Sequence, residues 1–265
     1  MISVIVTTYE RRALLARTLA SVYAQTTADR EVIVVDDGST DGTAEFLRSQ
    51  PVSMIAMGHC GNPATTRNAG LARARGQLIA FLDSDDTWEP TALEELTGAL
   101  AGRPEAGFAY CAYTPPPFSF PAVPRFGDIF DQLLESDFLV TGGVLMRRSV
   151  AVAVGPYDPA CSPAEDWDYW LRLGAIASGV FTPRALIRID SVADSISRAP
   201  GGAIYAANCR VTRKALTWCR ANRPASVALA RRAYRRSLLA QARYALNHRA
   251  IARTTRDLVM AAVGR

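Results

Sequence analysis

The feature that most restricts the fold of this chain is a regular alternation of short apolar runs with segments of helical spacing. In the N-terminal part the runs are ISVIVTTY, EVIVVDD, VSMIAM and QLIAFLD, and a helix-like segment follows each of them. The runs are apolar on both faces, which is typical of parallel strands covered by helices on two sides. The sequence therefore predicts an α/β fold with a mostly parallel central sheet flanked by helices on both faces.

The remainder of the chain follows a less regular pattern. We expect a strand at FAYCAY, a proline-rich loop at TPPPFSFPAVP, a short helix over 128–136, a strand leading into a helix at GGVLMRRS, and a hairpin-like pair at GVFTP and ALIRID. Helical spacing is found over 165–177 and over about 204–263, with interruptions near Pro224 and Asn247. The last part is therefore predicted to be a helical C-terminal extension over residues 201–265.

The net charge of +5 is unevenly distributed along the chain. From Arg210 onward arginines are frequent and Asp257 is the only acidic residue, which indicates an anionic partner for this part. The sequence shows no signal peptide, no C-x-x-C pair among its five cysteines, and no apolar run near the roughly 20 residues that span a bilayer. We therefore expect a cytoplasmic protein with reduced thiols.

Polar residues gather at the carboxyl ends of three predicted strands. Thr7, Thr8 and Tyr9 end the first, Asp36 and Asp37 the second, and the DSDD segment over 83–86 the fourth. Ligands of open parallel sheets bind beyond these ends. One acidic residue in such a turn is common, but together these residues predict a single ligand-binding crevice.

Four segments resemble the family 2 glycosyltransferases in sequence and in order: VIVTTYERRALLARTLASV, EVIVVDDGSTDGT, NPATTRNAGLARARGQLIAFLDSDD and AEDWDYWLRL. The resemblance covers roughly residues 2–198. It implies a GT-A fold over residues 1–200, with a nucleotide-sugar-binding half (1–105) and an acceptor-binding half (106–200). It also implies inverting, metal-dependent transfer from a nucleoside diphosphate sugar, with UDP favoured, to a hydroxyl of a saccharide, lipid-linked or other cell-envelope acceptor.

The DSDD segment is similar to the D-x-D motif of that family. Asp83 and Asp85 occupy alternate positions and can point the same way if the strand continues. The resemblance implies that Asp83 contacts the nucleotide ribose and that Asp85 binds Mg²⁺ or Mn²⁺, cations that prefer oxygen ligands and balance diphosphate charge. For Asp86 the alternative is a cap, with Thr87, of the next helix.

The resemblance further implies a nucleobase pocket made by Asp36 together with Thr7 and Tyr9. A carboxylate that accepts from a base N–H suits uracil, and a tyrosine ring can stack on the base. The neighbouring Asp37 and Asp41 have an alternative as turn and cap residues, which we prefer for Asp41.

Arg67 lies in the TTRNAG segment, where a guanidinium fork matches the phosphate oxygens of a donor. The alternative is a solvated arginine on a helix surface. Asn68 and Gly70 are interpreted as residues that let this helix approach the sheet.

The AEDWDYW segment supplies acidic residues beside two tryptophans. The resemblance implies that Asp166 is the catalytic base of the displacement, whereas acidic residues in a first helical turn also stabilise the helix dipole. We prefer that second interpretation for Asp168. Trp167 and Trp170 could line an acceptor sugar or fill the core, and the core is favoured for Trp170.

Two further segments are similar to family elements. Gly142 and Gly143 lie where relatives form an acceptor wall, although two glycines at a strand start can also mark a bend. IRIDSVADSISRAP is similar to a loop that in relatives carries a histidine, but here Asp190 is found near that place. The remaining candidates of the loop are Arg188, Ser195, Ser197 and Arg198, while His59 and His248 belong to no cluster.

The arginines of the C-terminal extension predict a basic helical face opposite Leu229, Leu238 and Leu239: Arg231, Arg232, Arg235, Arg236 and Arg243. One hypothesis is peripheral contact with anionic lipid at the inner face of a membrane, and the alternative is a cap on the domain or on a dimer partner. Nucleic acid is not expected, because aromatic residues are not interleaved with the basic ones.

Other functions remain to be weighed against glycosyl transfer. A non-catalytic sugar-nucleotide-binding or scaffolding protein would keep Asp36 and Asp85 without needing Asp166. A nucleotidyltransferase or an NAD-dependent oxidoreductase would need a glycine-rich phosphate loop, which TTYERRALL lacks.

Overall fold

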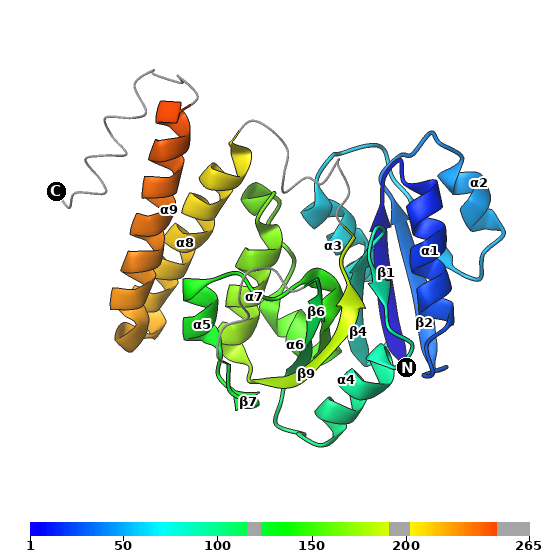
Figure 1. Ribbon diagram of the computed structural model, residues 1–265, viewed down its shortest axis with the longest axis horizontal. Helices are drawn as coiled ribbons and strands as arrows, with labels where there is room; N and C mark the ends of the chain where they lie inside the picture. The colour runs from blue at the N-terminus through cyan, green and yellow to red at the C-terminus, as the bar shows by residue number, and fades with distance from the viewer. Residues whose placement is uncertain (116–122, 191–201, 248–265) are drawn as a thin grey trace.

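The computed structural model describes residues 1–115, 123–190 and 202–247 and has a nine-stranded sheet at its centre (Figure 1). The strands are β1 (Ile2–Thr8), β2 (Arg30–Asp36), β3 (Ser53–Ala56), β4 (Leu78–Asp83), β5 (Thr87–Trp88), β6 (Phe108–Thr114), β7 (Phe126–Gly127), β8 (Val144–Arg147) and β9 (Gly179–Arg188). Their order is β3-β2-β1-β4-β8-β6-β9-β5, and β7 pairs with β9.

The sheet is mixed but mostly parallel. β1 is parallel to β2 and β4, and β2 is parallel to β3. β8 is antiparallel to β4 and β6, while β9 is parallel to β6. β1 to β4, β6 and β9 therefore point one way, as predicted, and β5, β7 and β8 point the other way.

Helices cover both faces of the sheet, as the apolar runs predict. They are α1 (Arg12–Tyr23), α2 (Thr43–Arg48), α3 (Pro63–Arg73), α4 (Ala92–Ala101), α5 (Phe130–Glu135), α6 (Arg148–Val154), α7 (Glu165–Ile176), α8 (Ala203–Asn222) and α9 (Val227–Asn247). Val4 and Val6 of β1 belong to the core under α1, α2 and α4, whereas Ile5 belongs to the core under α3, α5, α6 and α7. Alternate side chains of β1 thus point to opposite faces of the sheet and contribute to both cores.

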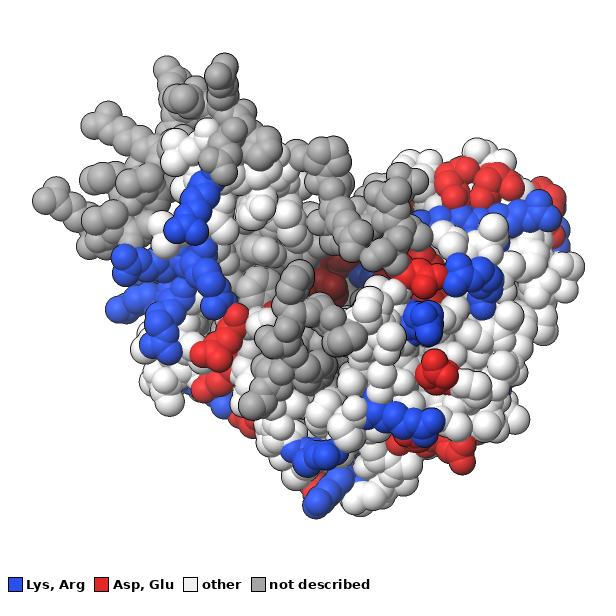
Figure 2. Space-filling view, in the orientation of Figure 1, with Lys and Arg blue, Asp and Glu red and all other residues white. Residues whose placement is uncertain are grey.

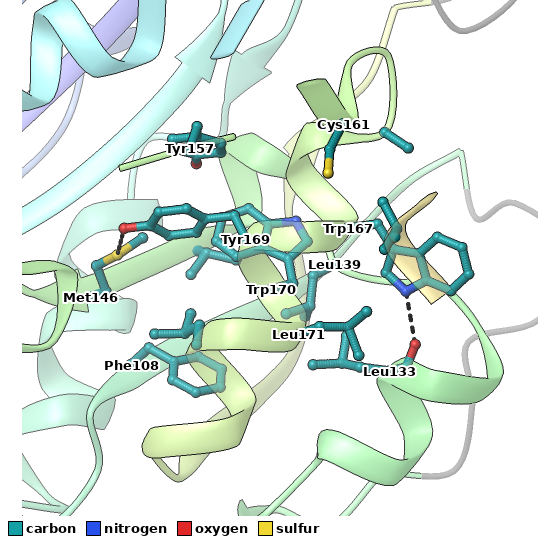
Figure 3. Close-up of a cluster of buried hydrophobic side chains, with 14 of the residues drawn as sticks. Phe108, Leu133, Leu139, Met146, Tyr157, Cys161, Trp167, Tyr169, Trp170 and Leu171 are labelled. Atoms are coloured by element: carbon teal, nitrogen blue, oxygen red, sulfur yellow. Dashed lines mark hydrogen bonds between the residues drawn. The ribbon is translucent and has the colours of Figure 1, made fainter. Parts of the chain in front are cut away.

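Large aromatic side chains fix α7 against the sheet (Figure 3). Tyr169 and Trp170 are fully buried, and the Tyr169 ring stacks on Tyr157 with centroids 4.0 Å apart. The Tyr169 hydroxyl also donates to Met146 Sδ of β8. Because aromatic burial is among the largest stabilising contributions in a core, the first turn of α7 is held in a defined place.

The hairpin-like pair predicted at GVFTP and ALIRID is wrong, because both segments belong to the single strand β9. Cys111 of β6 pairs with Thr182 and Ala112 pairs with Ala185, so Pro183 and Arg184 form a bulge. Proline has no N–H for the ladder, and a bulge accommodates it without reversing the chain.

The two last helices form a hairpin that packs on α5 and α7 (Figure 1). The predicted interruption is found at a 3-10 turn over Pro224–Ser226, where the Ser226 hydroxyl donates to Asp131 of α5. In the described segments no helix is both long and apolar enough to cross a bilayer. The division at residue 200 stays a prediction, because 191–201 lies outside the described residues.

Candidate active site

The carboxyl ends of β1, β2 and β4 bring their polar residues to one edge of the sheet. In the register of these parallel strands, Thr7 pairs with Asp83 and Thr8 with Asp36. The predicted convergence of these strand ends is therefore confirmed.

Asp36 and Asp37 are both buried, but they have different partners. Asp36 Oδ1 accepts from the N–H and the hydroxyl of Ser39. The Asp37 carboxylate accepts from the N–H groups of Cys60 and Gly61. Burial alone would raise the pKa of Asp37, but these hydrogen bonds hold it below its ordinary value. Asp37 thus fixes the loop before α3.

Tyr9 and His59 form a stacked pair at the edge, with ring centroids 3.9 Å apart and 18° between the planes. His59 Nδ1 lies 3.0 Å from Asp37 Oδ2, and both rings are exposed. The sequence interpretation missed His59 because it stands in no motif. The sequence clue to His59 is Gly38. Its φ is +81°, and a Cβ at this position would lie 2.8 Å from the backbone nitrogen of His59.

Asp41 is a turn residue just before α2, whose N-cap position is Gly42, in line with the preferred structural interpretation. Its carboxylate accepts from the N–H of Arg12 and from the N–H and hydroxyl of Thr43 at the start of α2. Gly70 lets α3 approach the sheet, as interpreted, because a Cβ there would lie 2.3 Å from Ile5 Cγ2 of β1. Asn68 instead bonds both backbone groups of Tyr157, which lies in no strand.

Arg67 is buried at the centre of the site, so the alternative of a solvated arginine is wrong. Its Nη1 lies 2.6 Å from Glu165 Oε1 and its Nη2 lies 2.9 Å from Asp83 Oδ1. Burial would lower the pKa of Arg67, but the two carboxylates raise it well above its ordinary value. With the guanidinium held by two carboxylates, the phosphate contact stays a prediction.

The DSDD segment concentrates negative charge at the end of β4. Asp85 Oδ2 lies 2.7 Å from Arg11 Nη1, and Asp86 Oδ1 accepts from the N–H of Asp190 at 3.3 Å. Burial, followed by repulsion from Asp83 and Asp85, raises the pKa of Asp86 to about 8. Burial and Asp83 likewise raise the pKa of Asp85, against the effect of Arg11.

The alternative of Asp86 as a helix cap is wrong. α4 begins at Ala92 after the N-cap residue Thr91, and β5 intervenes. β5 pairs with β9, and the Trp88 indole donates to the carbonyl of Gly142 at 2.6 Å. The strand therefore separates Asp86 from the helix and leaves its carboxylate at the sheet edge.

The donor set at this edge fits a hard divalent cation. Carboxylate oxygens are the preferred ligands of Mg²⁺ and Mn²⁺, and burial followed by repulsion among the carboxylates raises the pKa values of Asp85 and Asp86. In the described part of the chain, the one group of three ligand atoms within 4.8 Å of each other is elsewhere, at Asp158, Cys161 and Asp168. There Lys214 Nζ lies 2.7 Å and 2.6 Å from the two carboxylates and already supplies the cation.

Asp190 lies beside the DSDD segment, near the place of the family histidine. Its carboxylate lies 2.5 Å from Arg17 Nη2, and it adds to the repulsion that raises the pKa values of Asp85 and Asp86. Arg188 is exposed at the end of β9. Ser195, Ser197 and Arg198 lie outside the described residues.

The first turn of α7 faces this edge of the sheet through Glu165, the partner of Arg67. Asp166 is half-buried, lies in the first turn of α7, and accepts from the N–H of Trp167 at 2.8 Å through its Oδ1. Burial and then Glu165 raise the pKa of Asp166 to about 6, against the effect of Arg67. Asp168 instead forms ion pairs with Arg172 and Lys214, in line with its structural interpretation.

The tryptophans and glycines near the site serve packing. Trp170 is fully buried, and Trp167 is 6% exposed with its indole N–H donating to the Leu133 carbonyl (Figure 3). Gly142 and Gly143 are buried, and a Cβ on Gly142 would lie 2.2 Å from Ile187 Cδ1. The close approach made by Gly142 is therefore to a side chain of β9.

Comparison with known proteins decides the family. The family model described as "Glycosyl transferase family 2" matches residues 3–152, more than half of the chain. The chain belongs to glycosyl transferase family 2. The predicted resemblance is thereby confirmed.

Relatives and solved structures extend this finding. An *Escherichia coli* protein named UDP-Glc:alpha-D-GlcNAc-diphosphoundecaprenol beta-1,3-glucosyltransferase WfaP is 34% identical over 145 residues, which is 54% of this chain and 50% of that protein. *S. aureus* TarS 1-349 in complex with UDP-GlcNAc has a TM-score of 0.69 at 18% identity, over 89% of this chain and 71% of that chain. The mannosyltransferase PcManGT from *Pyrobaculum calidifontis*, in complex with GDP-Man and Mn²⁺, has a TM-score of 0.64 at 18% identity, over 98% of this chain and 78% of that chain.

The structural similarities show that this chain shares the fold of TarS and PcManGT. The chain spans about half the length of several of the curated relatives that it matches.

Proposed function

We propose that this family 2 member is an inverting, metal-dependent glycosyltransferase that moves a sugar from a nucleoside diphosphate, with UDP favoured, to a hydroxyl of a saccharide or other cell-envelope acceptor. One observation carries the proposal. The buried guanidinium of Arg67 binds Asp83 of the D-x-D segment and Glu165 next to Asp166. The segment with the proposed metal ligand and the segment with the proposed general base are distant in sequence, but Arg67 joins them into one site.

The choice of UDP has support from similar proteins. The *E. coli* relative is named for UDP-Glc and for a lipid-diphosphate-linked acceptor, and TarS is seen with UDP-GlcNAc. PcManGT is seen with GDP-Man and Mn²⁺, so the fold also accepts another base and a divalent cation.

The donor would bind along the strand ends. The exposed Tyr9–His59 pair offers an aromatic surface to the base, and Oδ2 of Asp36 can accept from a base N–H, with Thr7 beside it. Asp83 would contact the ribose. Asp85, with the neighbouring carboxylates, would hold Mg²⁺ or Mn²⁺, which supplies charge balance for the diphosphate leaving group.

Asp166 would act as the general base. With a pKa of about 6 its carboxylate is ionised at neutral pH and can accept the proton of an acceptor hydroxyl. The acceptor oxygen forms a bond to the anomeric carbon as the bond from that carbon to the diphosphate oxygen breaks. The electron pair of the broken bond leaves with UDP, and attack from the opposite side inverts the configuration.

The test begins with isothermal titration of UDP, GDP and dTDP, with and without Mn²⁺, into the wild-type protein and Asp85→Ala. We expect metal-dependent binding of UDP that weakens in the variant. Absence of nucleotide binding under both conditions would contradict the proposal. Donor binding without any turnover would instead favour the non-catalytic binding protein.

We also propose that the basic face of α9 contacts an anionic membrane surface. Ala230, Ala233 and Leu238 are buried in the hairpin, so α9 caps the domain with its other face. The outer face exposes Leu239 and Leu246 together with arginines, and Figure 2 shows basic side chains gathered over this end of the molecule: Arg231, Arg232, Arg235 and Arg243. Such a face has the composition of an interfacial helix.

A further inference from the structure

A cavity of about 380 Å³ lies between the first turn of α7 and the α8/α9 hairpin. Its volume falls within the usual range of small-molecule sites. Figure 2 shows acidic side chains recessed between the α8/α9 side of the molecule and the β1–β4 side. The polar residues that matter here come from four parts of the chain: Asp137, Asp166, Tyr205, Asn208 and Ser237.

The cavity adjoins the donor site. Asp166 lines it, while the preceding residue, Glu165, binds Arg67 and through it Asp83. A molecule in the cavity would thus lie beside the first turn of α7, which also contacts the D-x-D segment through Glu165 and Arg67. A hydroxyl of that molecule within hydrogen-bond reach of Asp166 can give its proton to this carboxylate.

The hairpin wall carries polar groups that have no partner in the described part of the chain. Among the residues that the structure describes, the Asn208 amide and the hydroxyls of Tyr205 and Ser237 make no hydrogen bond. They are not among the fully buried unpaired atoms, so water or a ligand can reach them from the cavity. These groups are therefore free to bind a ligand without first breaking a bond within the described structure.

The other wall carries carboxyl groups. Asp137 stands opposite the hairpin near Asp166, and burial, followed by repulsion from Asp166, raises the pKa of Asp137 well above its ordinary value. Arg236 also lines the cavity, but its Nη2 donates to the carbonyls of Leu134 and Glu135 at the end of α5. With that charge held by a helix C-terminus, the cavity disfavours an anionic ligand.

A neutral polyhydroxyl molecule satisfies both walls. Its hydroxyl groups can donate to the carboxyl oxygens of Asp137 and Asp166 and can also accept from the amide of Asn208. The Tyr205 ring, 5.0 Å from Tyr244 by centroid, adds an aromatic surface for the apolar face of a sugar.

We propose that this cavity is the acceptor site, in which Asn208, Ser237 and Tyr205 of the α8/α9 hairpin select a saccharide and hold one of its hydroxyls at Asp166. The inference rests on the proposed function. It assigns acceptor selection to the hairpin, the part of the chain that carries no family motif.

The experiment uses the full chain with methyl glycosides of glucose, galactose, mannose and N-acetylglucosamine as probes. Binding to the UDP- and Mg²⁺-loaded protein is measured by saturation-transfer NMR, and UDP binding is titrated separately. The variants are Asn208→Ala and Ser237→Ala. Asn222→Ala, an exposed position on the same helix as Asn208, is the matched control, and thermal unfolding checks that each variant folds.

We expect at least one glycoside to bind, and each cavity variant to weaken it about three- to tenfold, as for a lost neutral hydrogen bond. UDP affinity should stay unchanged, and Asn222→Ala should match wild type. Unchanged glycoside binding in both cavity variants would overturn the proposal, as would wild-type protein that binds UDP but no glycoside. Glycoside binding that needs Asn208 and Ser237, without any nucleotide binding, would keep a saccharide site and overturn the proposed function.

Discussion

The donor edge and the hairpin cavity differ in how far the protein satisfies its own polar groups. At the edge, Asp36 accepts from Ser39, Asp37 accepts from Cys60 and Gly61, and Asp85 is paired with Arg11. In the cavity, the described residues leave several side-chain groups of the hairpin unpaired. The first region is organised before a ligand arrives, whereas the second depends on a ligand or water.

This difference separates two kinds of specificity. A pre-organised edge can hold one constant chemical group, a nucleoside diphosphate, at little cost in reorganisation. A wall of neutral amide and hydroxyl groups can be changed residue by residue without disturbing ion pairs. Arg67 joins the two regions, because its carboxylate partners lie at the end of β4 and at the start of α7.

The largest expected effect concerns the boundary between the regions. Asp166→Asn should lower kcat by about 10²–10⁴-fold, because the amide cannot accept the acceptor proton. UDP affinity should remain that of wild type. Single-turnover transfer and UDP titration measure the two quantities, with Asp29→Asn, an exposed carboxylate, as control. Retained turnover would move the base to another residue.

Arg67→Met tests how much the ion pairs that connect the two regions contribute to the stability of the fold. Removing the guanidinium leaves Glu165 buried and Asp83 without its partner, so the free energy of unfolding should fall by about 3–5 kcal/mol. Arg75→Met is the matched control. Arg75 also forms an ion pair, with Glu31, but its side chain is 80% exposed, so its replacement should lower the free energy of unfolding by about 0–1 kcal/mol. Urea denaturation of both variants checks this contrast, and equal losses would contradict it.

The residues of the donor edge could be predicted from the sequence because they lie at the ends of strands that their own apolar residues define. The apolar runs set the parallel strands, and the polar residues at their carboxyl ends must then meet, as the pairing of Thr8 with Asp36 shows. The partners of these residues were less accessible. Nothing local places Arg11 on Asp85, and His59 reaches Tyr9 only because Asp37 and Gly38 shape the turn.

The acceptor side was beyond sequence reasoning for a different reason. Asn208 and Ser237 stand in helices without a motif and become neighbours of Asp137 only when the hairpin packs on α5 and α7. β9 was misread because a proline in a strand also occurs at hairpin turns, and only pairing with β6 shows a bulge.

The pH dependence sharpens the assignment of Asp166. Its pKa of about 6 predicts that kcat/KM falls about tenfold per pH unit below that value, as the base becomes protonated, and is level above it. Folding stability should change in the opposite direction. Because the pKa of Asp166 is higher in the folded protein than in the unfolded chain, protonation of Asp166 at low pH stabilises the native state, so this carboxyl does not cause a loss of activity by unfolding. Initial rates between about pH 5 and 8, with native structure followed by circular dichroism, measure both. A flat profile would contradict the assignment.

The smallest expected effect concerns the outer face of the hairpin, on the side away from its cavity contacts. Substituting Arg231, Arg232 and Arg235 by alanine should weaken binding to phosphatidylserine vesicles by about 1 kcal/mol per arginine, because each exposed guanidinium contributes to attraction by anionic lipid. The matched control replaces the exposed Arg48, Arg73 and Arg75 on the β1–β4 side. Flotation at low and high salt distinguishes the two sets. Binding that both triple variants lose equally would reflect net charge alone, and absence of wild-type retention would remove the membrane contact and leave the hairpin as a cap and acceptor wall.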